Sequence, residues 1–182
     1  MQTANPAPLG LFGFAVSLTM LSMFNVGWFG LDTFPLMMST AFVFGGALQI
    51  VAGLLEYPRG NTFNFVAFCS YGAFWFAFAT FLMIFGGKGP ITYLGAWLIV
   101  WGVFTVALWF ATLKLPKPNR VLQLVFLTLW IAFFLLGLSH VLNMMVLHTI
   151  GGWVGFLTAV LAFYLAAALV INEVEGKTRL PI

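Results

Sequence analysis

The sequence predicts an all-α membrane protein in which six transmembrane helices form one bundle and both termini lie in the cytoplasm. Hydrophobic residues make up 63% of the chain and charged residues only 6%, whereas roughly 25% of the residues of a soluble domain are charged. The apolar residues fall into six continuous runs, each close to the ~20 residues that a helix needs to cross a bilayer. No run shows the alternation of a membrane β-strand, so we expect helices, which bond their own backbone amides.

The predicted helices follow one another with short connections. They cover residues 9–28, 35–55, 62–85, 91–113, 121–141 and 147–171. The longest other segments are the linker 114–120 and the tail from Asn172, which leave no room for a soluble catalytic domain. We therefore expect residues 1–182 to form a single six-helix transmembrane domain. No basic segment with a small-residue cleavage site precedes the first run, so that run is expected to be retained as a helix.

Positive charge predicts the orientation, because basic residues are more frequent in loops on the cytoplasmic side. Lys88 alone falls in a loop opposite the termini. The other basic residues lie on the side that the termini share: Arg59, Lys114, Lys117, Arg120, Lys177 and Arg179. Both termini are therefore expected in the cytoplasm, and the protein is expected to be a multi-pass protein of the cytoplasmic (inner) membrane.

The first run begins with the segment 5–10, NPAPLG. Pro6 and Pro8 suit the first turn of a helix, where the amides that proline lacks would have no helical partner. The remaining amides and the positive end of the helix dipole favour an anion, and transporters use this arrangement to hold carboxylates. We expect Asn5 either to cap this helix or to contact the anion, and we include Gly10 in the same candidate site.

The second run carries small and polar residues at intervals of three and four. They are expected to share one helix face: Phe42, Gly45, Gly46, Gln49, Gly53 and Glu56. One interpretation is that the glycines permit close helix packing and that Gln49 bonds a neighbouring helix. Because a polar group facing lipid is costly, Gln49 and Glu56 together favour a water-filled or substrate-lined path.

Glu56 ends the second run close to Arg59 in the sequence. One interpretation is an ion pair at the surface. The other is that Glu56, Asn61 and Thr62 form the cytoplasmic rim of a pore. Asn61 or Thr62 would also cap the third helix, because their side chains accept hydrogen bonds from the free amides of a helix start.

Two further runs carry residues that suit either packing or a pore. Tyr71 lies near the middle of the third run; a buried tyrosine usually finds a hydrogen-bond partner, and a pore-lining role is the alternative. The sixth run has a face of small residues with a Gly-xxx-Gly pair, which is typical of helix packing inside a bundle or between subunits. That face comprises Gly151, Gly155, Thr158, Ala162 and Ala166.

The chemistry that the runs lack is also informative. No Lys, Arg, Asp or Glu lies near the middle of any run, so the sequence offers neither a buried cation for a carboxylate nor paired carboxylates for a proton relay. Clusters of metal ligands, a phosphate-binding glycine loop and a haem-type histidine pair are missing too, since His140 and His148 both fall near the last connection. We therefore expect no metal, no cofactor and no enzyme activity. The basic residues are not interleaved with aromatic ones as in nucleic-acid binding, and no nucleic-acid partner is expected.

Several motifs, taken in order, resemble the acetate uptake transporter family, also called the succinate/acetate permeases. They are NPAPLGL at 5–11, GGALQIVAGLLEY at 45–57, GNTF at 60–63, SYGAFW at 70–75 and WGVFT at 101–105. The likeness extends over all six runs and into the tail, at Asn172, Glu173, Leu180 and Pro181.

The resemblance implies a six-helix protomer that moves acetate and related short carboxylates, with succinate in bacterial members, generally coupled to protons. It also implies a homohexamer in the membrane lipid, with six protomers around a central axis. The narrow hydrophobic gate of the family falls here on Phe14, Tyr71 and Leu129, and Ala162 matches a position that influences substrate size. The linker 114–120 and the short loop at Lys88 depart from bacterial members, which affects loop details but not the pore.

We hypothesise that helix-end amides and the side chains of Asn, Gln, Thr and Tyr residues hold acetate. Acetate would then cross the gate with a proton, because a bare carboxylate loses its hydration in an apolar constriction. The alternative is a passive channel for acetate or for a small neutral solute such as urea, and the N-terminal motif argues against urea. A membrane sensor or scaffold would need partner-binding segments outside the membrane, and the chain has almost none.

Overall fold

The computed structural model describes residues 4–182, and over that range the secondary structure is helical, as predicted. The uninterrupted helices are α1 (Ala7–Asn25), α4 (Thr62–Met83), α5 (Ile91–Thr112), α6 (Arg120–Leu142) and α7 (Met145–Glu175). The second crossing runs over Leu31–Arg59. Within the described residues, 6 helices are long and apolar enough to cross a membrane, and their ends agree with the predicted runs to within a few residues.

The second crossing is not a regular α-helix. It consists of α2 (Phe34–Thr40), a π-helical segment (Ala41–Leu48) and α3 (Gln49–Glu56), which follow one another without a break. A turn of 3₁₀-helix flanks it at each end, at Leu31–Thr33 and Tyr57–Arg59.

The π-helical segment changes which residues share a face. Its hydrogen bonds join residues five apart rather than four, so positions before and after it fall out of α-helical phase. Gln49 and Glu56 are each 1% exposed, whereas Phe42 is 40% exposed and its ring packs against Phe76 of α4 with centroids 4.6 Å apart. The prediction that Phe42 shares the buried face is therefore wrong.

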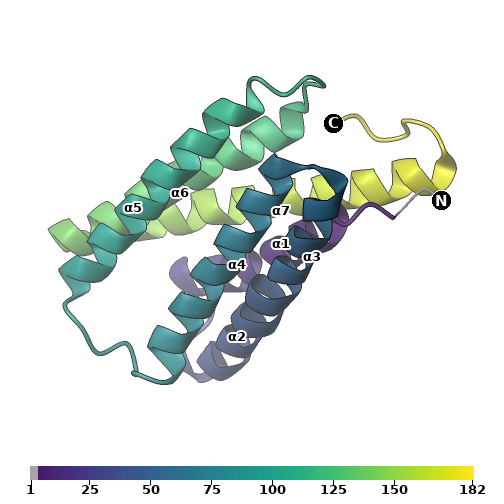
Figure 1. Cartoon of the computed structure of the whole chain (residues 1–182). Helices are drawn as coiled ribbons and strands as arrows, with labels where there is room; N and C mark the ends of the chain where they lie inside the picture. Colours follow the sequence, from purple (N-terminus) through teal and green to yellow (C-terminus); the bar gives the residue numbers. More distant parts are fainter. Residues whose placement is uncertain (1–3) are drawn as a thin grey trace.

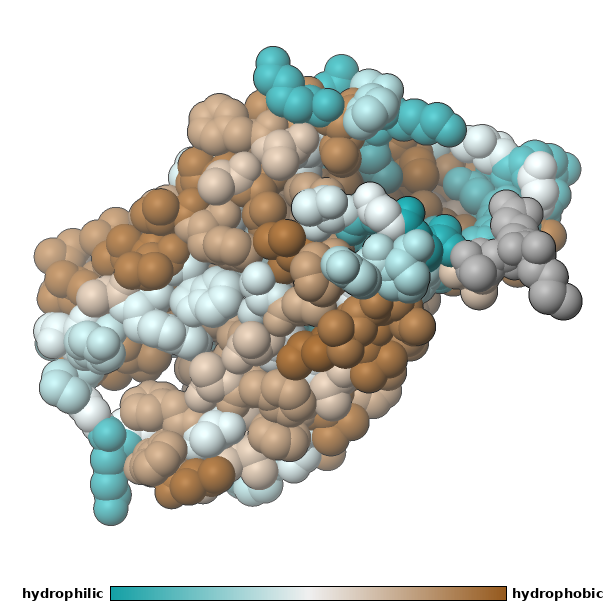
Figure 2. Space-filling model, viewed as in Figure 1, coloured by the Kyte–Doolittle hydropathy of each residue, from teal (hydrophilic) through white to brown (hydrophobic). Residues whose placement is uncertain are grey.

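Neighbouring helices pack in the order α5, α6, α7, α1, and then the π-helical segment and α3 lie between α1 and α4. α4 and α5 follow one another in the chain, but their backbones rarely approach closely, and the two helices meet mainly through long side chains such as Phe74 and Trp97. Figure 1 shows that both ends of the described chain lie at the same end of the bundle as the α5–α6 connection, while the α4–α5 loop lies at the opposite end. Hydrophilic side chains gather at the end with the termini, and the flanks of the bundle are mainly hydrophobic (Figure 2).

Glycines bring several helix backbones together. A Cβ added to Gly95 of α5 would lie 2.6 Å from the carbonyl oxygen of Gly137 on α6, and one added to Gly137 would lie 2.8 Å from the carbonyl oxygen of Gly95. In the small face of α7, a Cβ on Gly151 would meet Leu136 at 2.9 Å and one on Gly155 would meet Ser22 at 2.8 Å. These two positions of the predicted small face are therefore packed within this chain, against α6 and α1.

The tail after α7 folds back onto the helix. The Asn172 side chain accepts hydrogen bonds from the amides of Arg179 (2.7 Å) and Leu180 (2.9 Å), and it donates to the Leu180 carbonyl oxygen (2.9 Å). The hydroxyl of Tyr164 donates to the Pro181 carbonyl oxygen at 2.8 Å. The residues that carry the family likeness in the tail thus fasten the end of the chain.

Candidate functional site

A cavity of about 760 Å³ extends into the bundle from the end that holds the termini. Its wall comes from α1, α3, α4, α6 and α7 and from the α5–α6 connection. The polar and charged side chains toward the termini are Asn5, Glu56, Arg59, Asn61, Asn64, Lys117, Asn119 and Glu173. The rest of the wall is apolar apart from Gln49 and Tyr71, and includes Leu11, Phe14, Phe68, Phe126 and Leu129.

The structure brings most of the sequence-predicted site residues to this one cavity. Those in its wall are Asn5, Phe14, Gln49, Glu56, Asn61, Tyr71 and Leu129. The predicted residues that do not line it are Pro6, Pro8, Gly10, Thr62 and Ala162. Ala162 is nevertheless fully buried, in the same core cluster as Phe14, Tyr71 and Leu129.

Glu56 forms a buried polar network at the mouth of the cavity. The side-chain nitrogen of Asn64 donates to Glu56 Oε1 at 2.8 Å, and Arg59 Nε lies 3.6 Å from Glu56 Oε2. The Arg59 side chain also donates to the Ala4 carbonyl oxygen at 2.9 Å. The interpretation of a surface ion pair is wrong for Glu56, whose side chain is 1% exposed against 32% for Arg59. Glu56 needs these partners because burying a carboxylate without hydrogen bonds or an opposite charge costs free energy.

Asparagines cap two of the helices around the mouth. Asn61 Oδ1 accepts a hydrogen bond from the Asn64 amide at 3.1 Å and so caps α4. Asn119 Oδ1 accepts from the Leu122 amide at 2.8 Å and caps α6. Of the two predicted caps for α4, the structure therefore selects Asn61, while Thr62 is exposed and outside the cavity wall.

The N-terminal segment does not offer the free amides that its sequence suggested. Asn5 Oδ1 accepts from the Ala7 amide at 3.1 Å, and the Pro6 carbonyl oxygen accepts from the Leu9 and Gly10 amides at 3.1 and 3.3 Å. Pro8 has no amide hydrogen to offer. The expectation of free first-turn amides for an anion is therefore wrong, because the turn is closed on itself.

The residues of this segment shape the wall instead. Pro6 stands at the N-cap of α1, and Asn5 before it bonds the first helical amide and also lines the cavity, so a role at the helix start and a place on the substrate path are compatible. Pro6 and Pro8 are buried. A Cβ on Gly10 would lie 2.8 Å from the Phe68 ring, so Gly10 allows α1 to approach α4 closely.

Gln49 is the one amide side chain in the wall that is almost fully buried, at 1% exposure. Its carbonyl oxygen Oε1 has no hydrogen-bond partner among the described residues. Because buried polar atoms are nearly always paired, this acceptor is an exception that calls for an explanation.

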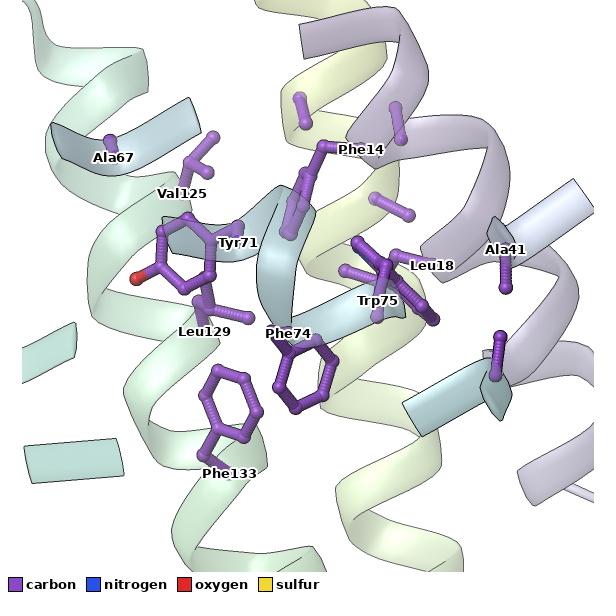
Figure 3. Close-up of a cluster of buried hydrophobic side chains, with 14 of the residues drawn as sticks. Phe14, Leu18, Ala41, Ala67, Tyr71, Phe74, Trp75, Val125, Leu129 and Phe133 are labelled. Atoms are coloured by element: carbon purple, nitrogen blue, oxygen red, sulfur yellow. The ribbon is translucent and has the colours of Figure 1, made fainter. Parts of the chain in front are cut away.

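The gate residues inferred from the family likeness lie close together (Figure 3), and all three are part of the cavity wall. The rings of Phe14 and Tyr71 lie 6.0 Å apart, and Leu129 approaches from α6. The exposed fractions are 6% for Phe14, 3% for Tyr71 and 4% for Leu129. The Tyr71 hydroxyl donates to Thr105 Oγ1 at 2.9 Å.

A second aromatic layer, missed by the sequence analysis, lies beyond these residues. The Phe74 and Phe133 rings meet edge to face at 5.3 Å, and the Phe74 ring stacks on Trp97 at 4.9 Å. Helical spacing places Asn64, seven residues before Tyr71, on the same face of α4, but nothing local in the sequence links Thr105 to the site.

The two histidines lie away from this cavity, with ring centroids 5.6 Å apart. Neither His140 nor His148 is part of its wall. Among residues 4–182, no group of three or more His, Cys, Asp and Glu side chains is arranged to hold a metal ion.

Six helices long and apolar enough to cross a membrane, around a cavity with both polar and apolar wall residues, are the architecture of an integral membrane transport protein. A family model described as the GPR1/FUN34/yaaH family matches residues 1–181. The chain belongs to this family, as the resemblance to the acetate transporters predicted. It is a multi-pass protein of the inner membrane and not an enzyme.

Proteins similar to this chain are named as transport proteins or channels. The succinate-acetate/proton symporter SatP of Escherichia coli (strain K12) is 43% identical over 187 residues, which cover 100% of this chain and 96% of that protein. Ammonia transport outward protein 2 of Saccharomyces cerevisiae is 34% identical over 174 residues, covering 91% of this chain and 61% of that protein. The solved structure of the bacterial acetate channel SatP superposes with a TM-score of 0.94 at 41% identity, covering 100% of this chain and 99% of that one.

Proposed function

We propose that this protein moves acetate and related short-chain carboxylates, succinate included, across the membrane together with protons. The observation that carries the proposal is the cavity, whose wall combines polar side chains at the mouth with Phe14, Tyr71 and Leu129, the three residues of the proposed gate. The names of the bacterial relative and of the solved structure support acetate as the substrate.

The mouth offers donors to an arriving carboxylate. Side chains of Asn5, Asn61 and Asn64 line it, and Arg59 and Lys117 provide positive charge there. The first-turn amides of α1 are bonded internally and are not free to bind the substrate. In the proposed path, side chains therefore donate the hydrogen bonds to the carboxylate. Within that path, Pro6, Pro8 and Gly10 hold the wall in place, Thr62 stands at its edge, and Ala162 supports the gate from behind.

Proton coupling follows from the apolar closure. A carboxylate that leaves water without replacement donors loses several kcal/mol of solvation, and the three side chains of the proposed gate are two aromatic rings and a leucine. The proposed gate is therefore crossed by the substrate together with a proton. Such a crossing requires no chain of carboxylates in the protein.

We also propose that residues 1–182 form a single transmembrane domain, that both termini are cytoplasmic and that six protomers assemble around an axis. The charge distribution supports the orientation, because Lys88 is the one basic residue in a connection opposite the termini. Labelling of single cysteines placed in the α4–α5 loop and in the tail with an impermeant reagent tests the orientation. Mass measurement of the protein in lipid nanodiscs tests the hexamer.

Uptake of labelled acetate and succinate into proteoliposomes tests the proposed transport. With an inward proton gradient we expect acetate to accumulate above the external concentration, and a protonophore should abolish this accumulation. A net inward current of negative charge that ignores the pH gradient would contradict proton coupling. Acetate that only reaches equal concentrations on both sides would support a passive acetate channel. The similar solved structure is described as an acetate channel.

A small neutral solute is the second candidate, since one relative is named for ammonia transport. Lys117 at the mouth favours the carboxylate over a neutral solute, while Arg59 is paired with Glu56, and Glu173 also lines the mouth. Osmotic swelling of proteoliposomes in urea, compared with acetate uptake by the same preparation, separates the two candidates. Urea permeation without acetate uptake would contradict the proposed function.

A further inference from the structure

Gln49 is held beside the inner end of the cavity by close packing. It is the first residue of α3, directly after the π-helical segment. A Cβ on Gly13 of α1 would lie 3.8 Å from Gln49 Cβ, so the side chain stands one residue along α1 from Phe14. The amide is thus part of the wall just before the gate.

Two donors on neighbouring helices are bonded to other acceptors, and the Trp75 indole nitrogen, buried as Gln49 Oε1 is, has no partner among the described residues. Ser17 Oγ donates to the Thr40 carbonyl oxygen at 3.4 Å, and Cys69 Sγ lies 3.9 Å from the Ile50 carbonyl oxygen as its donor. Gln49 Oε1 has no partner among the described residues. A buried acceptor left unpaired is costly, and a ligand that brings a donor would remove that cost.

A carboxylate cannot be that ligand, because its oxygens only accept hydrogen bonds. An anion beside Gln49 could accept a hydrogen bond from the amide NH₂. Its other oxygen would then face Gln49 Oε1, and two acceptors repel each other. The charged residues of the cavity wall, among them Arg59 and Lys117, lie at the mouth. No charged side chain of the described wall lies at the level of Phe14 to offset an anion there.

A neutral carboxylic acid matches the amide on both sides. Its O–H donates to Gln49 Oε1 while its carbonyl oxygen accepts from the Gln49 NH₂, which closes a ring of two hydrogen bonds. We infer that Gln49 binds the protonated acid and discriminates against the anion, so that the substrate gains its proton between the mouth and Gln49. The inference rests on the proposed function and specifies the form of the substrate that reaches the gate.

Two permanent mimics separate the protonation states. Acetamide has the size of acetic acid, is always neutral, and offers both a donor and an acceptor. Trifluoroacetate is of similar size and stays ionised at every pH used. In proteoliposomes containing the wild-type protein, acetamide should inhibit labelled acetate uptake equally at pH 6 and pH 8, and trifluoroacetate should inhibit weakly at both.

Gln49→Met keeps the length of the side chain but removes both hydrogen-bonding groups. We expect inhibition by acetamide to weaken about tenfold in this variant, the effect of losing two hydrogen bonds. Gln123→Met is the matched control. Gln123 lies on α6 outside the cavity wall and bonds Arg120 and the Thr112 carbonyl oxygen, so this variant should keep the wild-type inhibition.

The outcomes are distinguishable. Acetate uptake that is blocked by trifluoroacetate and indifferent to acetamide would overturn the inference and leave acetate transport standing. Absence of protein-dependent acetate uptake would overturn the proposed function and the inference with it. If Gln49→Met does not fold, the wild-type comparison of the two mimics still decides between the acid and the anion.

Discussion

The Tyr71 hydroxyl on α4 donates a hydrogen bond to Thr105 Oγ1 on α5 at 2.9 Å, and both side chains are buried. Thr105 in turn donates to the Trp101 carbonyl oxygen at 2.7 Å. The hydroxyl of Tyr71 points away from Phe14 (Figure 3). Because its one hydrogen is committed to Thr105, Tyr71 presents its ring to the cavity and its polar end to α5.

Thr105→Val should loosen the gate. Valine keeps the shape of threonine but leaves the buried Tyr71 hydroxyl without a partner, which costs about 1–3 kcal/mol and frees the ring to turn. We expect a lower melting temperature and a higher ratio of lactate to acetate uptake. Thr105→Ser keeps the hydroxyl and should behave as the wild type. Wild-type selectivity in Thr105→Val would show that the hydrogen bond does not hold the gate.

Leu129→Ala should widen the range of acids transported. Leu129 lines the inner end of the cavity and is 4% exposed, so its truncation removes part of the closure between Phe14 and Tyr71. We expect lactate uptake to rise relative to acetate uptake. Leu124→Ala is the matched control, since Leu124 lies on the same helix with 45% exposure and should leave the ratio unchanged. Equal ratios in both variants would remove Leu129 from the gate.

Ala162→Gly should have a smaller effect in the same direction. Ala162 is fully buried in the cluster that holds Phe14 and Leu129, and losing its methyl group gives those side chains room to move apart. Ala168→Gly on the same helix is equally buried but is not part of that cluster, so it controls for the cost of a glycine in α7. If the two variants select substrates alike, Ala162 does not influence substrate size.

Lys117→Gln should slow transport in a salt-dependent way. Lys117 is exposed and lines the mouth, where positive charge raises the local concentration of an anion. We expect acetate exchange, measured with equal concentrations on both faces, to fall about threefold at low ionic strength and to recover near 0.5 M salt as screening shortens the range of the charge. Lys114 lies in the same connection but outside the cavity wall. Lys114→Gln should therefore leave acetate exchange unchanged at both low and high salt. A deficit that persists at high salt would exclude attraction as its cause.

Gly95→Ala should destabilise the contact between α5 and α6. The added Cβ would lie 2.6 Å from the Gly137 carbonyl oxygen, and backbone cannot move aside as a side chain can. Overpacking of this kind costs about 1–3 kcal/mol, so we expect a lower melting temperature in detergent. Gly102→Ala on the same helix meets only the side chains of Phe133 and Phe134, at 3.3 Å or more, and should cost less. Equal losses would mean that helix propensity, not the contact, is responsible.

The six crossings could be predicted because lipid leaves few alternatives to a helix wherever an apolar run is long enough. The cap at Asn61 could be predicted for a similar reason, since the signal lies within four residues of sequence. The sequence places Phe42 on the wrong face because the α-helical spacing of three and four residues does not hold across a π-helical turn. Nothing in the pattern of residues marks where such a turn occurs.

The remaining misses are contacts between distant parts of the chain. The partner of Tyr71 is 34 residues away, and the pairing of Gly95 with Gly137 depends on the register of two helices. The first-turn amides of α1 are the exception, because their acceptors, the Asn5 side chain and the Pro6 carbonyl oxygen, are local and compete with any ligand. The sequence marks which residues are unusual, and packing decides what each one contacts.

The π-helical segment imposes a constraint on chain length. A turn with hydrogen bonds five residues apart holds one residue more than ordinary α-helix requires, and an α-helix turns about 100° per residue. Regular α-helical bonding through Ala41–Leu48 at the present chain length would therefore rotate α3 by about that angle and carry Gln49 and Glu56 out of the cavity wall. The loss of one residue from the segment would offset that rotation, so the number of residues between α2 and α3 and the π-helical bonding are matched to each other.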